Sequence, residues 1–468
     1  MSMPSEIASS DLSIGPRLDR LPSSRYVWRL VVLLSLGGFF ELYDLLMTGY
    51  ISPGLYVSGI FGDGEASLFG LSDQAAFASA TFAGLWVGTL VLGSVADRYG
   101  RRSVFTAALL WYAAATLVMC MQSTAAAIML WRFIAGIGLG VEMVTIDTYI
   151  SELVPKRTRG RSFAQSQAIM FCSVPTVAFL SWLLLPRQPL GIDGWRWVAL
   201  FPVTGAVVVW WIRRQLPESP RWLEQQGRHL EAHRIVTDIE LRVARELKVE
   251  LPPPEAAPVV VRSDSSADLR QIFRPPYRRY TIMLCVFNFF QTIGFYGFGN
   301  WLPKLISSQG IDIGDSLLYS LLIAISYPVG PLLFSFFADV YERKWQIVAA
   351  ALGSITFGLL FSQQSAPALL IACGVMITLS HNLMSYAFHA YQPELFPTQV
   401  RARAVGFVYS FSRLSTVFTS FMIAFFLHRF GTPGVFTFIA GAMAMVVIAI
   451  GGFGPRTRSR ALEEITRQ

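Results

Sequence analysis

The chain has 468 residues, of which 53% are hydrophobic and 15% are charged, and its mean hydropathy is +0.48. In a soluble domain about a quarter of all residues are charged, so this composition excludes a large soluble protein. The formal net charge of +8 is compatible with nucleic-acid binding, but the positions of the basic residues, given below, exclude that partner.

Apolar segments of roughly the 20 residues that span a bilayer recur along the chain. We therefore predict an all-α polytopic membrane protein. The first 25 residues are polar and contain no apolar signal-peptide core, so we expect the first span to be an uncleaved anchor. The twelve predicted spans are 26–53, 73–95, 103–121, 126–150, 163–185, 196–213, 279–303, 315–338, 346–363, 367–391, 404–428 and 433–453.

Basic residues alternate between the two sides of the predicted membrane. If the N-terminus is inside, the inner segments hold most of the arginines and lysines. Positively charged loops stay on the cytoplasmic side, so we expect a multi-pass protein of the inner (plasma) membrane with both termini in the cytoplasm. The basic residues then lie at the membrane surface and in the cytoplasmic loops, so they do not indicate a nucleic-acid partner. The outer loops hold only Arg187, Arg196, Lys304 and Arg429.

Nothing in the sequence indicates a cofactor or a metal. The four cysteines lie within or at the ends of apolar runs, and no CxxC pair occurs. Such thiols most often serve packing, so we expect neither a disulfide nor a metal site. The four residues are Cys120, Cys172, Cys285 and Cys373.

The two halves of the chain repeat each other. Two separate loops agree on an offset of 242 residues, shown by Asp97/Asp339, Tyr149/Tyr391, Glu152/Glu394, Arg159/Arg401 and Arg161/Arg403. Parallel repeats related by an axis along the membrane normal occur in transporters that bind substrate between the halves. The predicted parts are a cytoplasmic tail (1–25), an N-terminal six-helix bundle (26–213), a cytoplasmic linker with amphipathic helices (214–278), a C-terminal six-helix bundle (279–454) and a second tail (455–468).

Three motifs resemble the major facilitator superfamily, in particular its sugar porters and their organic-ion relatives. They are GSVADRYGRR (93–102), LPESPRWLEQQGRHLEA (216–232) and YQPELFPTQVRARAVG (391–406). The resemblance covers nearly the whole chain. It implies twelve helices in two pseudo-symmetric bundles and secondary transport by alternating access, and it implies no enzyme activity.

The seventh span departs from the sugar porters. It reads FFQTIGFYGFGNWLPKL (289–305), and aromatic residues replace most of the amides that would bind sugar hydroxyls; only Gln291 remains. Its GFGNWLP segment is more similar to proton-coupled metabolite and organic-acid porters. A plain sugar is therefore not the expected substrate.

Two carboxylates, Glu41 and Asp44, lie inside the first span, three residues apart and on one helix face. Ionisable groups inside a membrane usually find a partner. Arg132 of the fourth span lies at the same depth, at about 1.5 Å per residue. The resemblance to proton-coupled sugar porters implies that Asp44 and Arg132 form the coupling pair. Glu41 is the alternative proton acceptor, and a static salt bridge is the alternative function of the pair.

Arg413 lies near the middle of the eleventh span. Its planar guanidinium can bind a carboxylate with two hydrogen bonds, so we predict a substrate contact; the alternative is a pair with an acid such as Glu142. Polar and aromatic residues of spans 5, 7 and 10 are expected to line the same cavity, although each could instead make a helix–helix hydrogen bond. They are Gln167, Gln291, Tyr296, Asn300, His381 and Tyr386.

Charged residues gather at the predicted cytoplasmic ends of the spans. Alternating access needs a contact that breaks and re-forms in each cycle, and we predict that these residues latch the halves together; the alternative is ordinary solvated loop charge. The predicted latch consists of Asp97, Arg101, Glu152, Arg161, Glu218, Asp339, Arg343, Glu394 and Arg403.

The sequence thus predicts a monomeric proton-coupled symporter whose partners are a small organic acid, protons and the bilayer. Several alternatives remain open: a sugar or polyol porter, an organic-cation porter that uses Glu41 and Asp44, and a non-transporting receptor on the same scaffold. An intramembrane enzyme is the least favoured, because neither HExxH nor GxSxG occurs.

Overall fold

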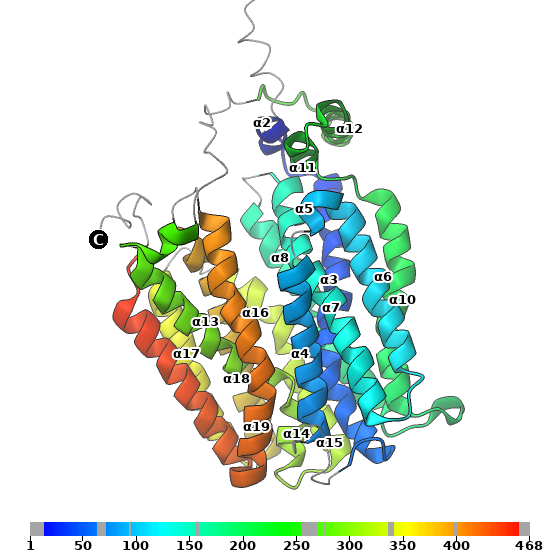
Figure 1. Cartoon of the computed structure of the whole chain (residues 1–468), viewed down its shortest axis with the longest axis vertical. Coiled ribbons are helices and arrows are strands. Elements are labelled where there is room, and N and C mark those ends of the chain that lie inside the picture. The colour runs from blue at the N-terminus through cyan, green and yellow to red at the C-terminus, as the bar shows by residue number, and fades with distance from the viewer. Residues whose placement is uncertain are drawn as a thin grey trace, which may run out of the picture.

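The computed structural model describes residues 14–62, 72–92, 95–155, 159–254, 269–275, 277–335, 341–396 and 400–457. All regular structure in these residues is helical, so the all-α prediction is confirmed (Figure 1). In lipid only a helix or a closed barrel satisfies its own backbone hydrogen bonds, and the long apolar segments of this chain form helices for that reason.

The first six spans are formed by residues 25–215. The fifth span is divided into two helices at Cys172. The helices are α3 (Arg25–Val57), α4 (Asp73–Leu92), α6 (Arg101–Met119), α7 (Ala125–Leu153), α8 (Arg159–Phe171) with α9 (Ser173–Leu184), and α10 (Gly194–Gln215), with short helices α5 (Val95–Tyr99) and η2 (Pro189–Gly191).

The last six spans are formed by residues 277–452. Gly431 has φ 65° and ψ −167°, which interrupts α19 and separates spans 11 and 12. The helices are α13 (Tyr277–Gly299), α14 (Leu302–Ser307), α15 (Ile313–Ala324) with α16 (Ser326–Ser335), α17 (Arg343–Phe361), α18 (Pro367–Glu394), α19 (Arg401–Val446) and η4 (Val447–Gly452), preceded by η3 (Leu269–Phe273).

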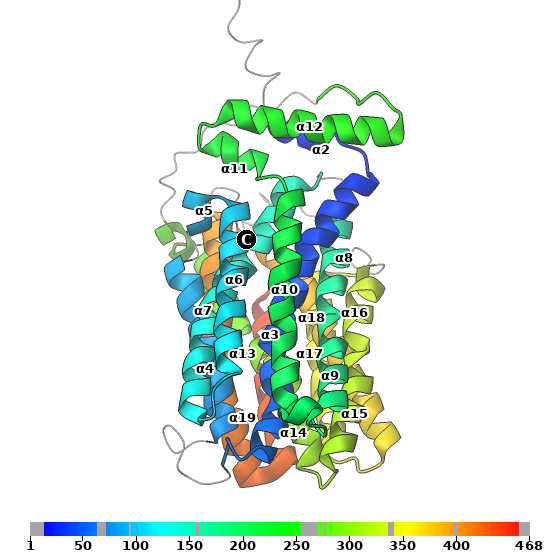
Figure 2. The ribbon, with the colours of Figure 1, turned by 90° about the vertical axis from the view of Figure 1, so that its right-hand side faces the viewer.

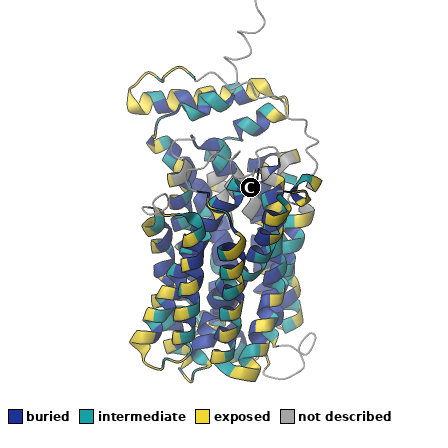
Figure 3. Ribbon diagram, turned by 90° about the vertical axis from the view of Figure 1, so that its left-hand side faces the viewer, coloured by how far each residue is buried: buried dark blue, intermediate teal, exposed yellow. Residues whose placement is uncertain are grey.

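Nine segments of the described chain are long and apolar enough to cross a membrane. One of them, 403–452, contains two spans, and α4 and α10 complete the predicted twelve. Large apolar side chains such as Trp111, Leu130 and Phe418 are exposed on the outside of the helices, and buried residues fill the interior (Figure 3). An exposed apolar surface of this kind is suited to lipid.

Each half has its own apolar core. One cluster of buried residues extends from Leu30 to Leu216 and adds Ala324 and Tyr327 from the other half. The second extends from Ile272 to Ile450 and adds Ala75. The halves meet where α4 packs on α19 and where α8 and α9 pack on α16 and α15. The exact part boundaries given above stay predictions.

Three further helices define one end of the molecule, which we call the linker end. They are α2 (Ile14–Asp19), α11 (Pro220–Gln225) and α12 (His229–Leu247), and α12 lies across the ends of the spans (Figure 2). The other end is called the far end. Thr457 donates its backbone N–H to Glu342, which precedes α17, over 2.9 Å, so both described chain ends lie at the linker end, as an even number of spans requires.

Two of the contacts between the halves lie toward the far end. A Cβ added to Gly49 of α3 would lie 1.8 Å from the carbonyl oxygen of Asn300, so only glycine allows this approach. The Ser79 hydroxyl donates to the Val417 carbonyl over 3.0 Å. These contacts hold the outer parts of the two bundles together in this conformation.

The short helix α2 is tied to α12 by charge as well as by apolar packing. Arg17 donates to Glu240 over 2.6 Å and Arg20 donates to it over 2.7 Å. Ile14 and Leu18 belong to the same buried cluster as the apolar side of α12. Burial alone would raise the pKa of Glu240, but the hydrogen bonds from Arg17 and Arg20 outweigh it, and the pKa lies below the usual 4.5.

This contact gives a pH-dependent prediction. Because the pKa of Glu240 is lowered in the folded chain, its stabilisation is complete above the ordinary pKa and is lost as the pH falls through the folded pKa. Glu240→Gln should therefore accelerate hydrogen exchange of residues 14–19 at neutral pH by roughly fivefold, the effect of about 1 kcal/mol for a partly exposed ion pair. The parent should lose the same protection only in acid. Glu231→Gln, whose pair with Arg228 is exposed, is the matched control. Equal exchange in all three proteins would contradict the prediction.

Candidate functional site

Asp44 of α3 and Arg132 of α7 form a fully buried ion pair. Arg132 Nη1 donates to Asp44 Oδ2 over 2.7 Å, and both side chains are 0% exposed. Arg132 Nη2 donates to the Asp44 carbonyl, and Nε lies 3.2 Å from the Thr48 hydroxyl and 3.0 Å from that of Thr81. The Thr116 hydroxyl donates to Asp44 Oδ1 over 3.3 Å. The guanidinium is thus held by α3 and α4 together.

The depth argument from the sequence therefore places these two residues correctly in space, and their part in proton coupling stays a prediction. A buried charge that loses its partner costs several kcal/mol. Neutralisation of Asp44 by a proton would release Arg132 from its strongest contact, so the pair has the chemistry of a protonation-dependent switch.

Glu41 lies one turn from Asp44, nearer the linker end, and is buried. Its charge acts on Arg413 and on Tyr296 of the other half. Glu41 is therefore close enough to Arg413 and Tyr296 for its charge to act across the interface between the halves.

Arg413 of α19 is buried at 5% exposure. It lies 3.4 Å from the hydroxyls of Tyr296 and Tyr409, at the long limit of a hydrogen bond, and its guanidinium carbon is 5.0 Å from the centre of the Tyr409 ring. Within the described part of the chain Arg413 makes no ion pair. Neither carboxyl oxygen of Glu142 has a hydrogen-bond partner among the described residues, so the alternative Arg413–Glu142 pair is not formed in this conformation.

Aromatic rings from both halves surround Tyr296. Phe82 of α4 meets its ring edge-on with centroids 4.9 Å apart, and Phe295 does so at 5.0 Å. Phe171 of α8 lies beyond, 6.5 Å from Phe295. A cation beside flat apolar rings is suited to a flat molecule that carries one negative charge.

The other predicted cavity residues are more dispersed. His381 shares a 2.9 Å hydrogen bond with the Ser354 hydroxyl, which is the helix–helix alternative for this residue. Gln291 donates to the Thr292 hydroxyl over 3.0 Å, and Asn300 is buried with neither amide atom bonded among the described residues. Gln167 and Tyr386 are half-buried.

Sequence reasoning missed Tyr409 and Phe82. Tyr409 is one helical turn before Arg413, so the spacing of four residues was a usable signal. Phe82 is one of many phenylalanines in the chain, and only its ring contact with Tyr296 and the packing of α4 against α19 distinguish it.

The charged residues of the linker end form two equivalent pairs. Arg101 Nη2 lies 3.1 Å from Glu152 Oε1, and Arg343 Nη1 lies 2.5 Å from Glu394 Oε1; the two pairs are separated by the repeat offset of 242 residues. Glu218 accepts the backbone N–H groups of Arg101 and Arg102 at the start of α6.

Each of these pairs lies inside one half, so neither pair joins the halves in this conformation. Arg161 and Arg403 are exposed. The side chain of Asp97 and the whole of Asp339 lie outside the described residues. The function of this set as a latch between the halves stays a prediction.

That prediction can be tested with spin labels at the linker ends of the two halves. An incompletely buried ion pair contributes about 0–1 kcal/mol, which changes a balanced conformational equilibrium by up to roughly fivefold. Glu152→Gln and Glu394→Gln should each shift the population toward states open at the linker end, and the measured distances should lengthen. Unchanged distance distributions in both variants would show that the pairs only brace their own halves.

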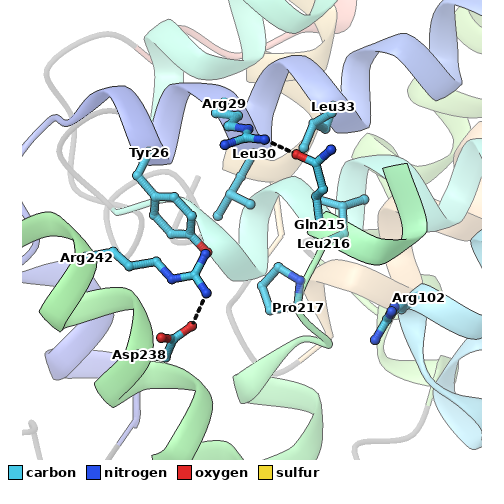
Figure 4. A pocket seen from close by; sticks show the side chains of 10 residues that line it. All are labelled: Tyr26, Arg29, Leu30, Leu33, Arg102, Gln215, Leu216, Pro217, Asp238 and Arg242. Carbon is cyan, nitrogen blue, oxygen red and sulfur yellow. Dashed lines mark hydrogen bonds and ion pairs between the residues drawn. The ribbon is translucent and has the colours of Figure 1, made fainter. Parts of the chain in front are cut away.

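A separate pocket of about 330 Å³ lies where the linker meets the N-terminal half. Arg29 donates to Gln215 and Arg242 pairs with Asp238 over 2.9 Å (Figure 4). Its walls come from the linker-end parts of α3, α6, α10 and α12, so it is not part of the site around Arg413.

The family described as "Sugar (and other) transporter" matches residues 30–468. The chain belongs to this family. It is 30% identical over 446 residues to the putative metabolite transport protein YyaJ of Bacillus subtilis, covering 95% of this chain and 96% of that one. It is 24% identical to the niacin transporter NiaP of Acinetobacter baylyi (97% and 100% covered) and 24% identical to the benzoate transport protein of the same organism (94% and 91% covered).

A solved structure confirms the fold. The xylose transporter XylE from E. coli, in a partially occluded inward-open conformation, matches with a TM-score of 0.75 at 17% identity, over 94% of this chain and 100% of that chain. Together with the family match over residues 30–468, this fold confirms the resemblance to the major facilitator superfamily. The protein is a multi-pass membrane transporter of this family and not an enzyme.

Proposed function

We propose that this transporter is a proton-coupled symporter that carries a small aromatic or otherwise flat monocarboxylate across the inner membrane by alternating access. The observation that carries the proposal is Arg413, a buried guanidinium of the C-terminal half whose described polar contacts are two tyrosine hydroxyls. One of these tyrosines, Tyr296, contacts Phe82 of the N-terminal half. The linker end is assigned to the cytoplasm, because the loops there are rich in basic residues.

A substrate carboxylate would supply what this site lacks. A guanidinium in an apolar interior is stabilised by a carboxylate with two parallel hydrogen bonds. The rings of Tyr296, Phe82 and Phe295 would contact the flat body of the substrate. A sugar would leave the buried cation without a counter-charge, and an organic cation would be repelled by it.

Two relatives support this substrate class by their names. Niacin and benzoate are both aromatic rings that carry one carboxylate, and the chain aligns with the transporters of both over most of its length. The similarity to XylE shows the fold and does not favour xylose. Two relatives from Escherichia coli, YdjE and YgcS, are inner-membrane metabolite transport proteins, which supports the assigned membrane.

Coupling is assigned to Asp44 and Arg132. A proton on Asp44 removes one charge of the pair and loosens the tie of α7 to α3, which makes the N-terminal half able to change its packing. When the proton leaves, the pair closes again. Glu41 lies on the same helix as Asp44, and its charge acts on Arg413. Through Glu41, substrate binding at Arg413 and protonation of Asp44 would depend on each other.

The proposal can be tested with the purified chain in liposomes under an inward acid gradient. Labelled nicotinate and benzoate should accumulate and should stop accumulating when a protonophore removes the gradient. Nicotinamide, benzamide, xylose and a quaternary amine should not compete, because each lacks the carboxylate. Empty liposomes are the control for passive entry of the neutral acids. Competition by xylose or by the amine, and none by the carboxylates, would contradict the substrate class.

A further inference from the structure

Glu142 is a buried acid in the middle of α7 that the coupling pair does not use. Its side chain is 0% exposed, and neither carboxyl oxygen has a hydrogen-bond partner among the described residues. An ionised carboxylate that is buried without donors costs several kcal/mol. In this conformation the protonated, neutral form of Glu142 is therefore more stable than the ionised form.

Its position is fixed by a close approach between α7 and α3. A Cβ added to Gly37 would lie 3.3 Å from Glu142 Oε1, so the carboxyl group reaches α3 at Gly37. Gly37 is one turn before Glu41 and about 10 Å along the helix from Asp44, at about 1.5 Å per residue. The three carboxyl groups therefore form a series from Asp44 through Glu41 to Glu142, directed toward the linker end.

The charged and titratable groups around Glu142 come from α3, α6 and α7. Glu41 and Asp44 act on it from α3. Tyr112 of α6 is fully buried, its hydroxyl has no partner among the described residues, and all three acids act on it. Arg132, on the same helix as Glu142, gives its donors to Asp44 and to two threonines. No counter-charge in the described cluster is thus left for Glu142.

We propose that Glu142 is a proton-binding group that receives the coupling proton from Asp44 by way of Glu41 and releases it toward the linker end. This inference rests on the proposed function. In each transfer the O–H bond of the donor acid breaks as an O–H bond forms on the acceptor, and the donor is left as a carboxylate. After the first transfer the Asp44 carboxylate pairs with Arg132, which is the arrangement observed here.

The arrangement explains why the acids are separate in space. Asp44 can be ionised because Arg132 neutralises it, and Glu142 can be neutral because it carries the proton. If Asp44 were the only proton site, it would have to release its proton to the cytoplasm while its pair with Arg132 was still open. A second acceptor nearer the linker end lets the proton leave Asp44, so that the pair with Arg132 re-forms before the proton is released into the cytoplasm.

The test compares Glu142→Gln with the parent in two assays: substrate-driven proton uptake into liposomes, and exchange of labelled for unlabelled substrate without a gradient. Glu142→Gln should lose substrate-driven proton uptake and accumulation while substrate affinity and exchange persist, because the amide occupies the same space and carries no transferable proton. Glu142→Asp should recover part of the proton uptake. Infrared spectroscopy of the parent should show the carbonyl band of a protonated carboxyl group at neutral pH, and this band should be missing in Glu142→Gln.

The outcomes separate the two proposals. If the parent shows no substrate-driven proton movement, the proposed symport fails. If the parent couples and Glu142→Gln couples equally well, or if the infrared band is the same in both, Glu142 is not the proton-binding group. If Glu142→Gln does not fold, the same comparison is made with Glu142→Asp and its infrared band, which must shift in frequency if the proton is on this residue. Glu231→Gln on α12 is the control for an acid outside the spans.

Discussion

Asp44→Asn is expected to abolish accumulation of the substrate under a proton gradient. The amide cannot bind and release a proton, so the pair with Arg132 loses the step that is proposed to couple it to transport. Exchange of substrate across the membrane without a gradient should persist, because an amide resembles the protonated acid in shape and charge.

The same change should lower stability. Removing one partner of a buried pair typically costs roughly 3–5 kcal/mol, since it leaves the other charge uncompensated. Asp44→Asn should therefore unfold at a clearly lower temperature than the parent, and Asp44→Asn combined with Arg132→Gln should recover part of this loss. Counterflow, accumulation and thermal unfolding, measured on one preparation, separate lost coupling from lost folding. Normal accumulation in both Asp44→Asn and Glu41→Gln would eliminate these acids as the coupling site.

Arg413→Ala is expected to weaken substrate binding at least about tenfold, because a hydrogen bond to a charged group contributes about 1.5–3 kcal/mol. Arg413→Lys should recover only part of the affinity, since an ammonium group cannot form the planar pair of hydrogen bonds. Binding is measured by calorimetry or by displacement of labelled nicotinate. Tyr409→Phe keeps the ring beside the guanidinium and removes one hydroxyl, so its effect should be much smaller.

The analogue series makes the same test from the side of the ligand. Amides or esters of the acid should bind weakly to the parent and lose little further affinity in Arg413→Ala, because the contact that they lack is the one that the mutation removes. Arg228→Ala, which removes an exposed arginine at the N-cap of α12, is the control for loss of a cation elsewhere. An uncharged sugar that binds tightly and equally to the parent and to Arg413→Ala would contradict the organic-acid proposal and leave the transporter assignment intact.

The sequence by itself determined the fold class and much of the depth of the site. The bilayer requires a helix to satisfy its own backbone and to be long enough to cross, so apolar length alone located the spans. Counting residues from a span end gives depth, and this count placed Asp44 opposite Arg132. The 242-residue offset also relates Arg101 and Glu152 to Arg343 and Glu394, and the structure contains both ion pairs.

The tertiary structure alone decided which groups meet. Residue counting gives position along a helix, but the direction of a side chain around the helix and the identity of the neighbouring helix depend on how all the spans pack together. The sequence could not show that Tyr409 and Tyr296 hold Arg413, or that the Arg101–Glu152 pair stays within one half. It allowed Glu142 to be a partner of Arg413, whereas packing places its carboxyl group beside Gly37 of α3, with no donor among the residues that the structure describes. The depth of a residue in the membrane follows from the local sequence. Which faces of two helices meet is decided by the packing of the whole bundle.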